Sequence, residues 1–240
     1  MADLTQQIQY VRDATRRLLA ELDGMTDADV RRPSLCTGWT VGHVLTHIAR
    51  NADGLRRSVE GARRGEVVSM YDSVQSRTAD IEAGAARPRA ELAADIAATA
   101  QALDDSWSGL DAASWDRDML HRLGRRPIRQ TPAMRWGEVE IHHVDLAGAY
   151  RPSDWPPPFV AYLLDHAPAS VGDRLPTGVA LDLAATDTAT GWSFGRADSR
   201  RVAVSGPSWA IAAWLLGRSG PVTASLSVVG GELPELAAWG

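Results

Sequence analysis

The chain has 240 residues, of which 45% are hydrophobic, enough for one large domain or two smaller ones with a sizeable core. Its net charge is −5 and its 25 basic residues are all arginine, so it has no basic excess to meet phosphates and nucleic-acid binding is not expected. The single cysteine, Cys36, excludes an internal disulfide and fits a reducing compartment. The charged N-terminus and the absence of a long apolar run predict a cytoplasmic protein without a membrane span.

Three long helices are predicted in the first half of the chain. Apolar residues recur at helical spacing over residues 3–23, which indicates an amphipathic helix. A second helix is expected from about Thr40, a capping residue, to about Arg64. A third is expected over residues 88–110, where Pro88 suits the first turn.

The connections between these helices differ in length. Residues 61–77 predict a loop followed by a short helix, and residues 114–133 predict a loop with a short hairpin around residues 123–127. The stretch from Met134 to Tyr150 predicts the fourth long helix. Four long helices with unequal connections indicate a four-helix bundle, which we assign to residues 1–152.

Composition changes after a proline-rich break at residues 150–159. One more helix is predicted over Phe159–His166, and a buried helix over residues 208–218. Segments of strand length with β-branched residues surround the second of these, at residues 179–186, 192–195, 200–206 and 222–229. The last nine residues are expected to form coil or an edge segment. The predicted fold is therefore mainly α, with a smaller α+β domain at residues 153–240.

The fourth helix carries the first candidate site. At 3.6 residues per turn, Glu138, His142 and Asp145 fall on one stripe that is bordered by apolar residues. Acid and imidazole would then project together from an inward-facing surface, as metal sites in helical bundles require. The alternative interpretation is a solvated polar stripe.

His47 on the second helix completes a candidate ligand set with Glu138 and His142. Two imidazoles and one carboxylate suit Zn²⁺, and three protein ligands leave a fourth position for water or substrate. Asp145 is then either a fourth ligand or, as we favour, a hydrogen-bond partner of a ligand or a carboxylate at the helix end. His143 points away from the stripe. The alternative for His47 is a half-exposed surface imidazole.

Two motifs carry a resemblance to a known family. GWTVGHVLTHIARNADGL (38–55) and MRWGEVEIHHVDLAGA (134–149) resemble the mycothiol-dependent maleylpyruvate isomerases of the DinB-like metalloenzyme superfamily. The resemblance extends over nearly the whole chain. Residues 69–84, residues 205–220 and the ending ELPELAAW favour the isomerase branch over other members.

The resemblance implies a site and a reaction. It implies that His47, Glu138 and His142 hold zinc, that Arg218 is catalytic, and that Arg77 and Arg135 bind substrate. The alternative for each arginine is an ordinary surface cation. The implied reaction is the cis-to-trans isomerisation of maleylpyruvate, a small dicarboxylate of the gentisate route, with mycothiol supplying a thiolate. Cys36 is then expected to be a packing residue and not a nucleophile.

Two other functions stay open. A mycothiol S-transferase would use the same three ligands but release the conjugate as product. A non-catalytic, metal-dependent binding module would keep the fold without the reaction. The sequence does not decide between zinc, nickel and iron, and it does not indicate an oligomeric state.

Overall fold

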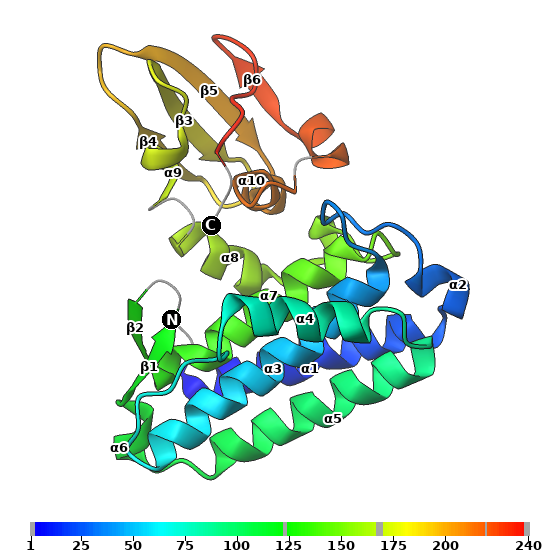
Figure 1. The fold of residues 1–240 in the computed structure, drawn as a ribbon. Coiled ribbons are helices and arrows are strands. Elements are labelled where there is room, and N and C mark those ends of the chain that lie inside the picture. The colour runs from blue at the N-terminus through cyan, green and yellow to red at the C-terminus, as the bar shows by residue number, and fades with distance from the viewer. Residues whose placement is uncertain (1–2, 122–123, 167–169, 219, 238–240) are drawn as a thin grey trace. The chain divides into compact units, whose positions relative to one another are not determined.

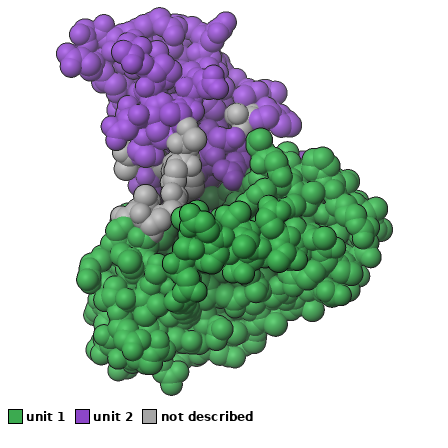
Figure 2. Space-filling model, in the orientation of Figure 1, with its two compact units in different colours: residues 1–150 green, residues 151–240 purple. Residues whose placement is uncertain are grey.

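The structure is a computed structural model, and it describes residues 3–121, 124–166, 170–218 and 220–237. The chain divides into two compact units, Met1–Tyr150 and Arg151–Gly240 (Figure 2). This division falls two residues before the predicted boundary at residue 152. Among the described residues, no helix is both long enough and apolar enough to cross a membrane.

The first unit is a bundle of four long helices, as predicted (Figure 1). Each helix packs against two others: α1 and α3 both contact α5 and α7. The four long helices are α1 (Leu4–Asp23), α3 (Val41–Arg63), α5 (Arg89–Ser108) and α7 (Thr131–Asp145). Short elements connect them: α2 (Asp27–Val30), α4 (Val74–Gly84), α6 (Ala112–Trp115), the hairpin β1 (Asp118–His121) and β2 (Gly124–Pro127), and a 3-10 turn at Ile128–Gln130.

Local sequence explains where α3 begins and which face it buries. The Thr40 side chain accepts a hydrogen bond from the backbone of His43, while the His43 side chain contacts the Thr40 backbone, so the two form a capping box. The helix then buries its apolar stripe completely, including Val44, Leu45 and Ile48. This confirms the predicted second helix and fixes the direction in which His47 points.

Helix α4 lies against α3 because glycines remove the side chains between them. A Cβ atom at Gly42 would lie 2.1 Å from the carbonyl oxygen of Ala85, and one at Gly84 would lie 2.5 Å from a Thr46 methyl carbon. These distances are far below van der Waals contact, so the close approach requires glycine at both positions. Helix α4 therefore brings its own residues next to the turn of α3 that carries His47.

The prediction that α7 runs from Met134 to Tyr150 is wrong at both ends. The helix begins at Thr131, with a proline in its first turn, and ends at Asp145. Ala147 adopts a positive φ of 53°, which takes the chain out of the helix. The Glu21 carboxylate then accepts hydrogen bonds from the backbone of Ala149 at 2.8 Å and of Tyr150 at 3.2 Å. A residue outside the motif, on α1, thus stabilises the chain after this helix.

The second unit combines a four-stranded sheet with helices, which confirms the predicted α+β part. Its strand order is β4-β3-β5-β6, in which β3 and β5 are parallel and the outer pairs are antiparallel. The strands are β3 (Val179–Ala185), β4 (Thr190–Phe194), β5 (Arg200–Gly206) and β6 (Ser227–Val229). The helices are α8 (Pro157–His166), α9 (Val171–Arg174) and α10 (Ser208–Leu215), with 3-10 turns at Pro152–Asp154 and Pro221–Ser225.

The predicted strand at residues 222–229 is wrong in its first half, where the Pro221–Ser225 turn replaces it. Pro221 has no amide hydrogen to donate to a neighbouring strand, and its fixed φ suits the start of a helical turn. Only Ser227–Val229 pairs with β5. Residues 232–237 form no regular structure, as expected, and the rest of the predicted coil lies outside the described residues.

Candidate metal centre

Three predicted ligand side chains, from α3 and α7, meet inside the first unit. His47 Nε2 lies 3.0 Å from Glu138 Oε2 and 3.2 Å from His142 Nε2, and His142 Nε2 lies 3.5 Å from Glu138 Oε2. A tetrahedral zinc ion with bonds of about 2.0–2.1 Å holds its ligand atoms about 3.3 Å apart. The triangle formed by these three atoms therefore has the size that one such ion needs.

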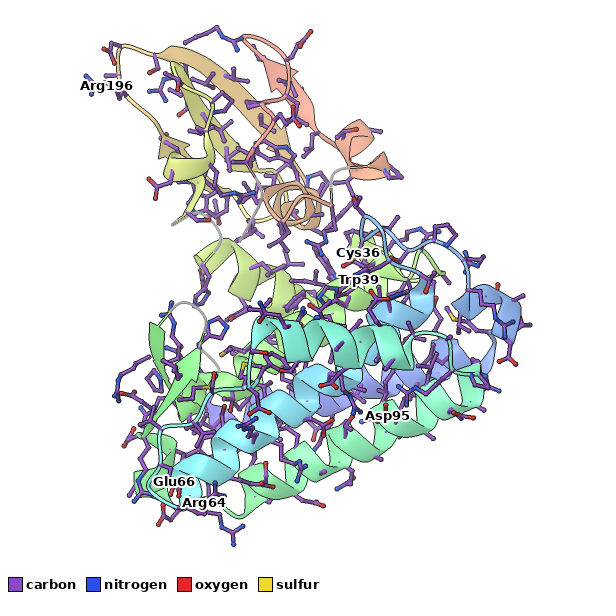
Figure 3. The ribbon with its side chains drawn as sticks, in the orientation of Figure 1. Cys36, Trp39, Arg64, Glu66, Asp95 and Arg196 are labelled. Atoms are coloured by element: carbon purple, nitrogen blue, oxygen red, sulfur yellow. The ribbon has the colours of Figure 1, made fainter. Side chains whose placement is uncertain are left out.

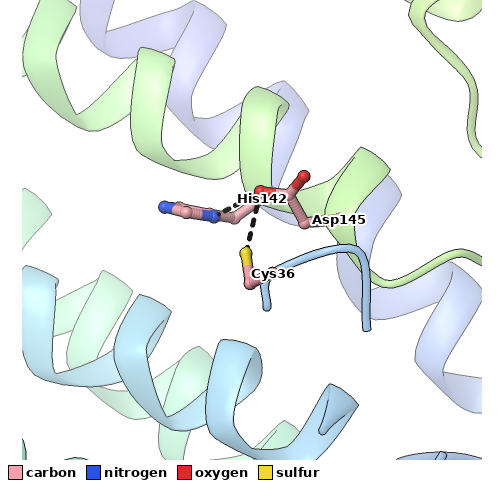
Figure 4. A group of neighbouring side chains, drawn as sticks. All are labelled: Cys36, His142 and Asp145. Carbon is pink, nitrogen blue, oxygen red and sulfur yellow. Dashed lines mark hydrogen bonds and ion pairs between the residues drawn. The ribbon is translucent and has the colours of Figure 1, made fainter. Parts of the chain in front are cut away.

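Asp145 fixes the orientation of the His142 ring. Its Oδ2 atom lies 2.8 Å from His142 Nδ1 and 3.4 Å from the thiol sulfur of Cys36 (Figure 4). A buried carboxylate is an acceptor, so His142 Nδ1 carries the hydrogen and the lone pair of Nε2 faces Glu138 and His47. Asp145 is only 1% exposed, and in this arrangement it acts behind a ligand and is not itself one.

His47 is buried, so the surface-imidazole alternative is wrong for this residue. Its ring meets the His142 ring edge-on, and the Trp39 ring lies 5.6 Å away, centroid to centroid. Burial lowers the pKa of His47, although the hydrogen bond and charge of Glu138 oppose this effect. The imidazole is therefore neutral at physiological pH, which is the form that binds metals.

Glu138 keeps its negative charge at all physiological pH values. Burial alone would raise the pKa of its carboxyl group, but the hydrogen bond from His47 and the positive charges around it lower the pKa to about 2. Arg135, one turn before it on α7, is one of these charges. An ionised carboxylate beside two imidazole rings is a suitable donor set for a divalent cation.

Arg135, predicted to bind substrate, lies entirely inside the bundle. Its side chain is 0% exposed, and its Nη1 atom donates to the carbonyl of Ile48 at 2.6 Å and to Asn51 at 2.9 Å. Burial lowers its pKa to about 10, against the opposing charge of Glu138. These contacts favour a structural and electrostatic role for Arg135. The predicted binding of substrate by Arg135 would require its hydrogen bonds to Ile48 and Asn51 to break.

Arg77, on α4, reaches the centre as expected for a residue near the site. Its Nη2 atom lies 3.0 Å from His47 Nδ1. Because a guanidinium only donates, His47 Nδ1 is the acceptor here, and His47 Nε2 donates to Glu138. For Nε2 to bind a metal, the ring hydrogen must stand on Nδ1 instead. The residues fit a metal ion, provided that Arg77 turns away from His47 Nδ1.

The remaining predicted residues lie apart from this triangle or in the other unit. His143 points away, as expected: it contacts Glu21 at 3.0 Å and stacks on Tyr150. Arg218 belongs to the second unit, where its backbone amide closes the end of α10 and its Nη1 atom donates to the carbonyl of Leu216. Its catalytic role stays a prediction.

Sequence reasoning did not single out Trp39 or Tyr71, although both lie inside quoted motifs. Trp39 and Cys36 are in the loop that leads into α3 (Figure 3). Tyr71 lies under the Arg77 guanidinium, whose central carbon is 5.7 Å from the ring centroid. Both aromatic residues lie near their partners only in space, Trp39 near His47 and Tyr71 near Arg77, so the sequence spacing gave no signal for either contact.

The fold and the donor set together define the class: a four-helix-bundle protein with a candidate divalent-metal centre of two histidines and one glutamate. The profile of the family described as "Mycothiol maleylpyruvate isomerase N-terminal domain" matches residues 11–147. The match spans more than half of the chain, so the chain belongs to this family.

Solved structures resemble the chain over its full length. A crystal structure of the mycothiol-dependent maleylpyruvate isomerase is 26% identical, with a TM-score of 0.87 and 100% coverage of both chains. A histidine-to-alanine mutant of that enzyme matches with the same identity, coverage and TM-score. No curated protein matches the sequence. The predicted family, enzyme class and fold class are thereby confirmed.

Proposed function

We propose that this chain is a mycothiol-dependent isomerase that converts maleylpyruvate to fumarylpyruvate with the help of a zinc ion. The observation that carries the proposal is the triangle of His47, Glu138 and His142, whose size and donor chemistry suit one tetrahedral ion with a free position. The family match and the full-length likeness to an isomerase of this kind support the substrate and the thiol.

The chemistry follows from the substrate. A carbon–carbon double bond conjugated to a carbonyl does not rotate, but addition of a thiolate converts it to a single bond that does. Elimination of the same thiolate restores the double bond in the trans form, so atoms and electrons balance without an oxidant. A bound zinc ion supplies one thing: it lowers the pKa of a thiol so that the thiolate is present at neutral pH.

The residues of the chain have separate tasks in this proposal. Glu138 and the two histidines hold the ion, and Asp145 keeps the His142 ring turned toward it. Arg77 offers a guanidinium next to His47, and a guanidinium matches a carboxylate with two parallel hydrogen bonds. Arg218 is proposed, from the family resemblance, to stabilise the enolate that forms after addition.

The test follows maleylpyruvate consumption and product mass in four mixtures, with and without zinc and with and without mycothiol. The proposal expects turnover only when both are present, with a product of unchanged mass and trans geometry. Turnover without mycothiol contradicts the proposal. A product whose mass is raised by that of the thiol identifies an S-transferase. Purified protein that binds no metal yet stays folded identifies a binding module.

A further inference from the structure

Tyr71 lies on the same face of α3 as His47, although it is not part of that helix. Gly54 follows His47 by seven residues, so the two share a face and lie about 10 Å apart along the helix axis. A Cβ atom at Gly54 would lie 3.1 Å from the carbonyl oxygen of Met70 and 3.2 Å from Cε1 of Tyr71. The glycine thus lets the tyrosine ring pack directly against the helix backbone, in line with the metal ligand.

Arg77 bridges the space between this ring and the metal centre. Its guanidinium carbon is 5.7 Å from the centroid of the Tyr71 ring, and its Nη2 atom is 3.0 Å from His47 Nδ1. The side chains of Tyr71 and Arg77 are both half-buried. A cation over an aromatic face at this distance is attracted to it, and partial burial strengthens the attraction.

The charge environment of Arg77 differs from that of its neighbours. Arg50, Arg56 and Arg57, on the adjacent helix, each form an ion pair with a carboxylate. Among the described residues, no ion pair joins a carboxylate to Arg77. The Arg77 guanidinium carbon lies over the Tyr71 ring, and a guanidinium has five N–H donors, so donors remain that can bind an anion.

Metal binding makes the tyrosine contact more important. When His47 Nε2 is a ligand, His47 Nδ1 carries the hydrogen and no longer accepts one from Arg77. Of the two contacts described above, only the one with Tyr71 is compatible with this tautomer of His47. The Tyr71 hydroxyl stays protonated at neutral pH, because burial and the charge of Glu138 raise its pKa. A neutral ring does not compete with an incoming carboxylate.

We propose that Tyr71 is a positioning residue, whose ring holds the Arg77 guanidinium beside the metal centre so that its edge receives one carboxylate of the substrate. The identity of the substrate rests on the proposed function, but the contact does not. Any small dicarboxylate of similar length is expected to use the same guanidinium.

The experiment compares Tyr71→Phe, which keeps the ring, with Tyr71→Leu, which removes it. Binding of succinate, an unreactive dicarboxylate, to zinc-loaded protein is measured by calorimetry, and KM and kcat for maleylpyruvate are measured in parallel. Zinc content and thermal midpoint serve as controls for folding. For Tyr71→Phe, both the dissociation constant for succinate and KM for maleylpyruvate are expected to stay within about twofold of the native values.

Tyr71→Leu is expected to weaken succinate binding and to raise KM by about 5- to 30-fold, with kcat within about threefold. Arg77→Lys keeps the charge but loses the flat face, so adding Tyr71→Leu to it should have little further effect. If Tyr71→Leu does not fold, succinate affinity is compared among the native protein, Arg77→Lys and the double variant Tyr71→Phe with Arg77→Lys. This comparison still measures whether succinate binding needs a flat guanidinium at position 77.

Several results would overturn the inference. These are no measurable succinate binding by the native protein, unchanged affinities in Tyr71→Leu or in Arg77→Lys, and equal losses in Tyr71→Phe and Tyr71→Leu, which would assign the effect to the hydroxyl. A loss in kcat alone would also count against it. Failure of the proposed function looks different: the native protein would not isomerise maleylpyruvate, while the succinate series would still separate the variants as described.

Discussion

Replacing Asp145 with asparagine tests how much metal affinity depends on the carboxylate behind His142. Asparagine has the same shape, and its amide oxygen can still accept the hydrogen of His142 Nδ1. What it removes is the negative charge at the 2.8 Å contact. That charge fixes the hydrogen on Nδ1 and makes Nε2 a stronger donor toward the metal.

The expected magnitude follows from the geometry. Loss of a partner that orients a metal ligand weakens metal affinity by about 10- to 100-fold, which corresponds to about 1.4–2.8 kcal/mol. Asp145 is 1% exposed, so no solvent screens its interaction with His142 and the upper half of this range is expected. Cys36 contributes only a weak thiol donor at 3.4 Å, so Cys36→Ser is the matched control and should change zinc affinity by less than about twofold.

Zinc affinity is measured by competition with a chromophoric chelator at fixed pH, with circular dichroism to establish that each variant is folded. The backbone carbonyl of residue 145, which accepts from Leu35 at 2.9 Å, is unaffected by the substitution and should keep the loop in place. Zinc affinity of Asp145→Asn within twofold of that of the native protein, together with loss of zinc in His142→Ala, would refute this role of the Asp145 charge.

Three further predictions concern stability. Arg135→Met should lower the free energy of unfolding of the metal-free protein by about 1.5–3 kcal/mol in urea titrations, because it removes charge-assisted hydrogen bonds from a fully buried site. As a control, Arg196→Met, at a side chain that is 84% exposed, should change this free energy by less than about 0.5 kcal/mol. Equal effects of the two substitutions would refute the structural role of the buried arginine. Gly42→Ala should lower the free energy of unfolding by about 1–3 kcal/mol, because the added methyl group overpacks the contact with Ala85. Gly137→Ala, with nothing within 4 Å of its Cβ position, should leave the free energy of unfolding unchanged or raise it. The reverse order of stabilities would contradict the packing described. Because folding lowers the pKa of His47 below its usual value of 6.5, the unfolded chain binds the proton at a higher pH than the folded protein does. The metal-free protein should therefore lose stability as the pH falls through 6.5. An equally steep loss in a His47→Ala variant would exclude His47 as the cause.

Much of the bundle could be predicted because its helices carry a clear apolar period. The spacing of Glu138 and His142 fixed their common face, and helical periodicity placed His47 on a second helix whose inner face is apolar. What spacing alone does not determine is which helices pack together. The approach of α3 to α7 depends on the packing of the whole bundle, so only the structure gives the distances between His47, Glu138 and His142.

The errors have local physical causes. Helix α7 ends at Asp145, Ala147 then takes a positive φ, and Glu21 on α1 accepts hydrogen bonds from the amides of residues 149 and 150. No local sequence pattern indicates a partner more than 120 residues away. Pro221 suits a helical turn where β-branched residues had favoured a strand. The Tyr71–Arg77 pair was missed because an aromatic residue in a loop carries no periodic signal.

The proposed reaction needs a bound metal ion with one position free for the sulfur of mycothiol, and substitution with cobalt(II) makes both properties visible in the absorption spectrum. The protein is loaded with one equivalent of cobalt(II), and its absorption spectrum is recorded before and after addition of mycothiol. We expect one tightly bound ion, lost in His47→Ala and His142→Ala, and a new thiolate-to-cobalt charge-transfer band when the thiol is added. A spectrum that mycothiol leaves unchanged, or cobalt retained by both histidine variants, would contradict the proposal.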